Sequence, residues 1–378
     1  MSVNIYEITK KQRQSKIGLA SIEDFELGNR NHENIQVILE NPNISLYSLD
    51  FNQNIAVFVE TPPVVNLSQA SFFYATQFEK AIRVLTIPFD GMIRLAKAVN
   101  FEDKNLILIH SVGRAGSTLA SQIFAQIENI GNISEPDALT ALVAARHYRL
   151  SSDSYLLDLL QAAVLLLCKT NTPKTWVIKG RSFTLELGDF FRQAFPRSKN
   201  IFLYRDAESW LRSAITAFSN DAEKTLEERY TWEKKVRQSL TPLVPLIAKH
   251  DNDEHLSFVN ILFLMWQSII EQYIYLQNTG IDMLAIPYDC WLSDPYSTSI
   301  AMLTYCELEA PEKTRIQSVL VADSQAGTAL SQQTIKQKSV SSQISELETM
   351  KFLFSDIAEP LLSKINNKNI GHDNTGLC

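Results

Sequence analysis

One stretch in the first third of the chain, residues 105–121, constrains the fold more than any other. It opens with residues 106–109, an unbroken apolar run typical of a strand covered on both faces of a parallel sheet. Gly113 and Gly116 then permit a tight turn, and apolar residues at helical spacing continue over residues 119–127. The sequence therefore predicts a strand, a glycine loop and a helix in succession.

This loop has the composition of an anion-binding site. After a strand, successive backbone N–H groups and the positive end of the following helix converge on one point, where cationic and hydroxyl side chains add donors. The residues expected to bind are Gly113, Arg114, Ala115, Gly116, Ser117 and Thr118. The alternative is a glycine turn that binds nothing.

The loop departs from the pattern of nucleotide triphosphatases. That pattern, GxxxxGK followed by Ser or Thr, needs its lysine to reach the outer phosphates and its hydroxyl to hold magnesium. Here Ser117 follows Gly116 directly, and the cationic residue is Arg114, inside the loop. A P-loop kinase or hydrolase is therefore a weaker alternative, which magnesium dependence would identify.

Composition limits the partners. The 378 residues, 45% hydrophobic and 20% charged, suit a soluble globular protein with one large domain or two modest ones. A net charge of −7 argues against nucleic acid or an anionic membrane as partner, yet allows a local basic pocket. Residues 1–16 lack the apolar core of a secretory signal, so the sequence predicts a cytoplasmic protein. No CxxC, HxxxH or HExxH pattern occurs, and no metal site is predicted.

The first 100 residues are expected to form a small α+β unit, and residues 101–378 the main α/β domain. Runs at residues 35–39, 44–51 and 55–59, separated by Asn-rich turn signals, predict a strand meander. Helical spacing follows over residues 72–99. The expected role of this unit is scaffolding; shaping an acceptor pocket or forming a homo-oligomer are alternatives.

Glu135 lies where the chain is expected to return to the glycine loop. A short strand over residues 132–134 precedes it, and it follows Arg114 by 21 residues, enough for a loop, a helix and a return strand. A carboxylate at that place supplies what deprotonation of an acceptor hydroxyl needs. The alternative is an ordinary acidic charge at a helix start before Pro136.

Two further strand ends carry cations. Residues 175–178 predict a strand that ends at Lys179, and ligands of open α/β sheets gather at such ends; a surface lysine is the alternative. Residues 201–204 predict another strand, followed by Arg205 and, eight residues later on a helix, Ser213. Such a pair could hold one phosphate from two sides. The alternative is a strand whose final acid holds magnesium. It is disfavoured because in such a strand the acid directly follows the apolar run, whereas here Arg205 comes first.

In this order the motifs resemble the sulfotransferases that use 3'-phosphoadenosine 5'-phosphosulfate (PAPS), whose donor loop reads (K/R)-x-G-(S/T)-T. The resemblance covers about residues 104–295 and includes Tyr288 and Asp289, similar to the family's Y-E-D-L segment. It departs from the family's D-K-x-P wording at Ile178, where an acid is usual, and at Arg181.

The resemblance implies a P-loop-like, three-layer α/β/α fold and transfer of a sulfonyl group from PAPS to an acceptor, most simply a hydroxyl of a small molecule, without a metal. Glu135 would be the base, Lys179 and Arg114 would stabilise the transferring and leaving groups, and Arg205 with Ser213 would bind the 3'-phosphate. A polar segment at residues 317–343 matches a loop that closes over the nucleotide in relatives, or is simply flexible. A non-catalytic nucleotide-binding or interaction protein is the other alternative.

Overall fold

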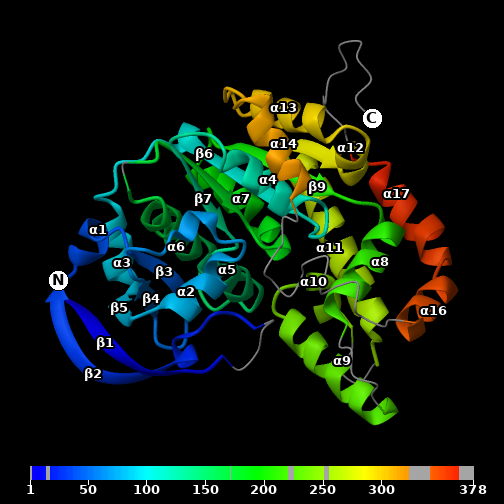
Figure 1. Ribbon diagram of the computed structural model, residues 1–378. Helices are drawn as coiled ribbons and strands as arrows, with labels where there is room; N and C mark the ends of the chain where they lie inside the picture. Colours follow the sequence, from blue (N-terminus) through cyan, green and yellow to red (C-terminus); the bar gives the residue numbers. More distant parts are fainter. Residues whose placement is uncertain are drawn as a thin grey trace. The chain divides into compact units, whose positions relative to one another are not determined.

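The computed structural model describes residues 2–13, 18–170, 172–219, 225–250, 255–322 and 341–365 (Figure 1). The chain divides into two compact units. Unit 1 comprises Met1–Leu108 and Ile127–Lys199, and unit 2 comprises Ile109–Gln126 and Asn200–Cys378. The domain boundary expected at residue 100 stays a prediction.

The N-terminal part of unit 1 is a five-stranded antiparallel sheet in the order β2-β1-β5-β4-β3. Its strands are β1 (Ser2–Lys11), β2 (Phe25–Asn34), β3 (Ile44–Asp50), β4 (Ile55–Glu60) and β5 (Arg83–Pro88), and its helices are α1 (Val37–Glu40), α2 (Phe73–Lys80) and α3 (Phe89–Ala96). The expected α+β character of this part is confirmed.

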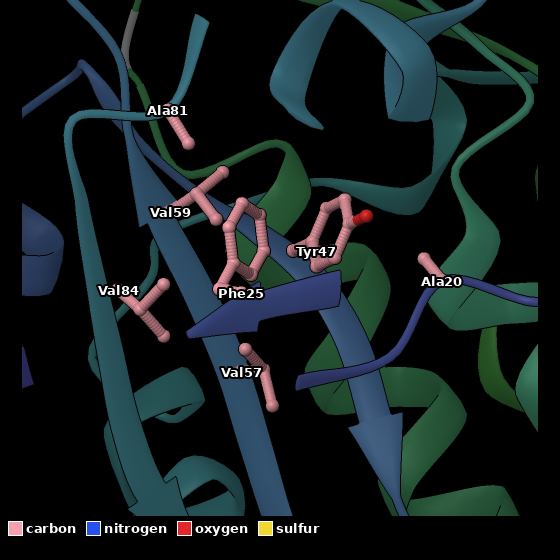
Figure 2. Packing of buried hydrophobic residues seen from close by; sticks show 7 residues of the cluster. All are labelled: Ala20, Phe25, Tyr47, Val57, Val59, Ala81 and Val84. Atoms are coloured by element: carbon pink, nitrogen blue, oxygen red, sulfur yellow. The ribbon is translucent and has the colours of Figure 1, made fainter. Parts of the chain in front are cut away.

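One apolar cluster holds this sheet together (Figure 2). The rings of Phe25 from β2 and Tyr47 from β3 lie 5.3 Å apart, beside Val57 and Val59 of β4 and Val84 of β5. The Tyr47 hydroxyl donates a 2.6 Å hydrogen bond to the Asp24 carboxylate. This bond gives the buried hydroxyl the partner that water cannot supply there. Cross-strand packing therefore fixes the sheet's register.

Two sequence predictions for this part are wrong. Residues 35–39 do not form a strand, because residues 37–40 form the short helix α1. Residues 72–99 are not one interrupted helix, because β5 separates α2 from α3. The centre of β5 carries four consecutive buried residues, and an apolar run that short does not distinguish a strand from a buried helix.

The second sheet is parallel and five-stranded, in the order β10-β9-β6-β8-β7. Its strands are β6 (Leu106–Ser111), β7 (Ile130–Ser134), β8 (Thr175–Lys179), β9 (Lys199–Tyr204) and β10 (Leu284–Pro287). All six residues of β6 are buried, as its apolar sequence predicts. The predicted α/β class with a central parallel sheet is confirmed.

Helices account for most of the remaining described chain. Unit 1 has α5 (Asp137–His147), α6 (Asp153–Leu167) and α7 (Gly188–Ala194). Unit 2 has α4 (Ser117–Phe124), α8 (Ala207–Phe218), α9 (Leu226–Leu240), α10 (Pro245–Ala248), α11 (Phe258–Asn278), α12 (Tyr288–Ser293), α13 (Pro295–Tyr305), α14 (Lys313–Val321), α16 (Ser341–Thr349) and α17 (Glu359–Leu362). Of the polar segment at 317–343, residues 323–340 lie outside the described residues. Among the described helices, none has the length and apolarity to cross a bilayer.

Candidate functional site

The glycine loop of unit 2 has a backbone built for a tight turn. Gly113, Arg114 and Gly116 have φ of 76°, 50° and 86°, and Gly116 is the N-cap residue of α4. Glycine has no side chain that could cap the helix, so the N-cap residue offers no side-chain acceptor to the first N–H groups of α4. Ser117 and Thr118 form the first turn of α4 and are buried. The predicted succession of strand, glycine turn and helix is therefore confirmed.

Trp210 of α8 holds the glycine loop in place through hydrogen bonds to two of its carbonyl groups. Its indole Nε1 donates to the carbonyl oxygens of Val112, at 3.0 Å, and Gly113, at 2.8 Å. The Val112 N–H in turn donates to the Leu203 carbonyl of β9 at 3.1 Å. These bonds occupy the loop's carbonyls, so that they do not present negative charge to an incoming anion.

The three predicted phosphate-binding side chains of unit 2 come together at this loop. Arg114 Nε donates to Ser213 Oγ at 3.1 Å, and Arg205 Nη1 donates to the Arg114 carbonyl at 3.3 Å. The arginine at the end of β9 and the serine on α8 therefore both contact the residue inside the glycine loop. Two guanidinium groups held this way form a locally cationic patch in a chain with a net charge of −7.

Arg205 is held by three further side chains, of which only Tyr288 belongs to a segment singled out in the sequence. Its Nε donates to Ser209 Oγ at 2.8 Å, and its guanidinium lies 4.4 Å from the ring centroid of Tyr288. Trp266 of α11 donates from Nε1 to the Arg205 carbonyl at 3.0 Å. Cation–π and hydrogen-bond contacts thus pre-orient the guanidinium, which lowers the entropy cost of binding a ligand.

In unit 1 the predicted base and lysine form an ion pair. Lys179 Nζ lies 2.6 Å from Glu135 Oε1 and 3.4 Å from Ser134 Oγ, and the side chains of Lys179 and Glu135 are 3% and 18% exposed. The pair follows from the register of the sheet, since Ser134 of β7 is opposite Lys179 of β8. The surface-lysine alternative is wrong, because Lys179 is buried.

A second, buried carboxylate supports this pair. Asp137, the first residue of α5, is fully buried and accepts from the Ala20 N–H at 2.9 Å and from Arg13 Nη2 at 3.2 Å. Arg181 Nε lies 3.0 Å from Asp137 Oδ1 and 4.0 Å from Glu135 Oε2. Burial raises the pKa of the Asp137 carboxyl, and the two guanidinium groups oppose that rise.

Aromatic residues of the N-terminal part cover this cluster. The guanidinium groups of Arg181 and Arg13 lie 4.3 and 4.6 Å from the ring centroid of Tyr74, and Lys179 Nζ lies 5.8 Å from that of Phe72. Burial raises the pKa of the Tyr74 hydroxyl, with the Arg181 charge opposing it. Residues before position 100 are therefore part of the surroundings of Glu135 and Lys179.

The supporting residues of the site are less visible in the sequence than its charged residues. Asp137 lies two positions after Glu135, and Arg181 lies two positions after Lys179. This repeated spacing, one pair of acids and one pair of cations, is the sequence signal that could have indicated them. Trp210 lies on the helix predicted to carry Ser213, and Tyr288 belongs to the segment similar to Y-E-D-L, but the sequence does not indicate the contacts that these side chains make. Trp266 lies on α11, which no motif specifies. Within the described ranges, no group of three or more His, Cys, Asp or Glu side chains could hold a metal ion.

The structure is similar to solved sulfotransferases over about 70% of the chain. One from Alicyclobacillus acidocaldarius has 12% identity and a TM-score of 0.41, over 69% of this chain and 93% of that one. STF9 from Mycobacterium avium has 10% identity and a TM-score of 0.38, over 69% and 78%. Mouse SULT7A1, solved with PAP, has 11% identity and a TM-score of 0.38, over 72% and 92%. No family model and no curated protein matches the sequence. Because these similarities are distant, the chemistry has to be inferred from the chain's own residues.

Proposed function

We propose that this chain is a sulfotransferase that moves a sulfonyl group from PAPS to an acceptor hydroxyl, most simply that of a small molecule. The observation that carries the proposal is the arrangement in unit 2, where Arg205 and Ser213 both contact Arg114 inside a glycine loop at the start of α4. A donor with a 5'-phosphosulfate and a 3'-phosphate needs two anion sites, which a loop with an arginine and a second arginine can supply.

The loop also favours this donor over ATP. A P-loop kinase uses its lysine for the outer phosphates and needs a magnesium ion. In this chain the position after Gly116 is Ser117, and the loop cation is an arginine, which binds phosphate and sulfate oxygens in a bidentate fashion. The donor set therefore fits a bisphosphate nucleotide without an obligatory metal.

The proposed step is an in-line displacement at sulfur. The acceptor oxygen forms a bond to sulfur while the bond between sulfur and the 5'-phosphate oxygen breaks, and Glu135 takes the acceptor proton. The leaving group departs as 3'-phosphoadenosine 5'-phosphate (PAP), whose new negative charge Arg114 and the N–H groups of residues 113–118 offset. Lys179 is proposed to stabilise the transferring sulfonyl group, and its contact with Glu135 holds both side chains in place beforehand.

The donor half of the proposal is tested by calorimetric titration of the full chain with PAP and, separately, with ATP and magnesium. Wild type should bind PAP, and Arg205→Ala should lose about 2 kcal/mol of binding free energy, the value of a charge-assisted contact. Lys104→Ala is a control, because this cation belongs to unit 1 and forms an exposed ion pair with Glu102. Binding of magnesium ATP alone, or of neither nucleotide, would sink the proposal.

The catalytic half is tested by screening hydroxyl acceptors for PAPS-dependent sulfation with wild type and Glu135→Gln. The amide keeps the shape and can still accept a bond from Lys179, but it cannot take a proton, so turnover should fall by about 10²- to 10⁴-fold. PAP affinity should stay unchanged. Equal turnover in the two proteins would exclude Glu135 as the base while leaving donor binding intact.

A further inference from the structure

Trp291 presents a buried donor that the part of the chain described here does not satisfy. This tryptophan lies on α12, is 5% exposed, and its indole Nε1 has no hydrogen-bond partner in the described structure. A buried N–H without an acceptor costs more than the hydrogen bond itself contributes, so such groups are few in native proteins. The position of Trp291 Nε1 therefore needs a physical reason.

The indole lies directly against the start of α4. A Cβ atom built on Gly116 would lie only 3.2 Å from both Nε1 and Cδ1 of Trp291, so the nitrogen-bearing edge of the ring occupies the space left by the missing side chain. Gly116 is the N-cap residue of an eight-residue helix, at φ of 86°. The Trp291 donor thus lies beside Gly116, the N-cap residue that gives α4 no side-chain cap.

A second residue of α12 points to the same ligand. Tyr288, three positions before Trp291 and so on the same side of the helix, lies against the guanidinium of Arg205, which itself donates to the Arg114 carbonyl. The short helix α12 therefore contacts both Arg205 and Gly116, two residues proposed to bind the donor. The family's wording for this segment has a leucine at the corresponding place, so the tryptophan is not part of the resemblance.

We propose that Trp291 is a binding residue whose Nε1–H donates a hydrogen bond to an anionic phosphate oxygen of the ligand held at the start of α4. The inference rests on the function proposed above and adds a residue to it. An indole N–H can only donate, so it suits an acceptor-only group such as a deprotonated phosphate oxygen. In a buried place this single neutral bond acts on affinity without adding charge.

The test compares two tryptophans whose buried indole N–H has no acceptor among the described residues. Trp176 of β8 is also buried with an Nε1 that lacks an acceptor in the described residues, but it belongs to unit 1 and faces Gly131. Both are changed to phenylalanine, which keeps an aromatic ring and removes the N–H. Calorimetry with PAP should show a Kd about tenfold weaker for Trp291→Phe, and an unchanged Kd for Trp176→Phe.

A measurement on wild-type protein removes the dependence on a variant that folds. In protein labelled with ¹⁵N-tryptophan, the five indole N–H signals are assigned by single substitutions or by elimination. On PAP addition the Trp291 signal should move downfield and its exchange with water should slow, while the Trp176 signal stays in place.

The outcomes separate the two proposals. If wild type binds PAP, Trp291→Phe binds it equally well and the Trp291 signal does not move, then this inference is wrong and the sulfotransferase proposal stands. If wild type does not bind PAP, the proposed function fails and this inference with it. A weaker Kd in both phenylalanine variants would also overturn the assignment, because the effect would then come from general loosening.

Discussion

Two residues with proposed chemical roles have a strained backbone. Arg114 has φ of 50° and Glu135 has φ of 60°, in the left-handed region that costs a residue with a side chain roughly 1–3 kcal/mol. Six described non-glycine residues lie there, and the other four are Asn54 and Asn129, which adopt it more easily, and Arg149 and Glu307. The strain persists because Arg114 is bonded to Ser213 and Glu135 to Lys179. That pattern is consistent with side chains aimed for function rather than for stability.

His110 of β6 makes a pH-dependent contribution to stability. It is buried, with Nε2 3.3 Å from Asn200 Oδ1, and burial lowers its pKa from 6.5 to about 4. Below pH 6.5 the unfolded chain takes up a proton that the folded chain refuses, so the stabilisation present above pH 6.5 is lost progressively down to about pH 4. The difference corresponds to about 3 kcal/mol in the free energy of unfolding.

The measurement is urea unfolding of wild type and His110→Gln between pH 4 and pH 7. Glutamine keeps an amide near Asn200 but does not titrate, so wild type should lose stability relative to the variant as the pH falls through this window. Other groups titrate here too, among them Glu186, whose pKa burial raises to about 7, and they cancel in the comparison. Parallel curves for the two proteins would show that His110 is not the cause.

At the scale of elements, the β7–β8 pair positions Glu135 and Lys179, and one glycine permits it. Gly131 lies opposite Trp176 in the ladder, and a Cβ there would meet the tryptophan ring at 2.4 Å and Pro173 at 2.6 Å. A methyl group cannot fit without moving the ring or the strand, and overpacking of a core costs about 1–3 kcal/mol. The close approach of the two strands therefore depends on glycine.

Gly131→Ala should accordingly lower the urea midpoint of the chain by the equivalent of about 1–3 kcal/mol. Gly91→Ala in α3 is the matched control, because the nearest atoms to its new Cβ lie at 3.8 Å, an ordinary contact distance. In a helix that change should be neutral or stabilising by up to about 1 kcal/mol. If both variants unfold at the wild-type midpoint, β7 and β8 are not packed as closely as described.

The elements of the parallel sheet were predictable because their signals are local. Apolar runs that end at a glycine loop or at a cation predicted β6, β8 and β9. The hairpin of β1 and β2 was not predicted, since most of β2 is exposed and polar, and β1 pairs on its other side with β5, which lies far along the chain. The α1 and β5 assignments failed because a short apolar run lacks a period.

The charged residues of the candidate site were predictable for a related reason. Cations and acids at strand ends are visible in the sequence, and parallel strands bring their carboxyl ends to one edge. Side chains that arrive from other elements were not, because their contacts depend on tertiary packing. Trp266 of α11 reaches the Arg205 carbonyl from 61 positions further along the chain, and no spacing rule predicts such a contact.

At the scale of the whole molecule, the cations of the candidate site fall into two groups. In unit 2 they are Arg114 and Arg205, and in unit 1 they are Lys179, Arg181 and Arg13. The cations of unit 1 pair with carboxylates around Glu135, and those of unit 2 lie at the glycine loop. The proposed division of roles follows, with donor binding in unit 2 and proton transfer in unit 1.

This division predicts that unit 1 can be weakened without loss of donor binding. Asp137→Ala removes the carboxylate shared by Arg181, Arg13 and the Ala20 N–H. Removing one partner of a buried ion pair costs about 3–5 kcal/mol, so the urea midpoint should fall clearly. Glu102→Gln is the control, since its pair with Lys104 is exposed and its loss should leave the midpoint unchanged.

The Kd for PAP should stay within about twofold of wild type in Asp137→Ala, a change of less than about 0.5 kcal/mol. Every residue proposed to bind the donor, from Gly113 to Thr118 together with Arg205, Ser213 and Trp291, belongs to unit 2. Sulfation of any acceptor should fall at the same time, because Arg181 and the surroundings of Glu135 lose their anchor. A parallel loss of PAP affinity would mean that donor binding depends on unit 1, and the roles would then have to be assigned to the chain as a whole.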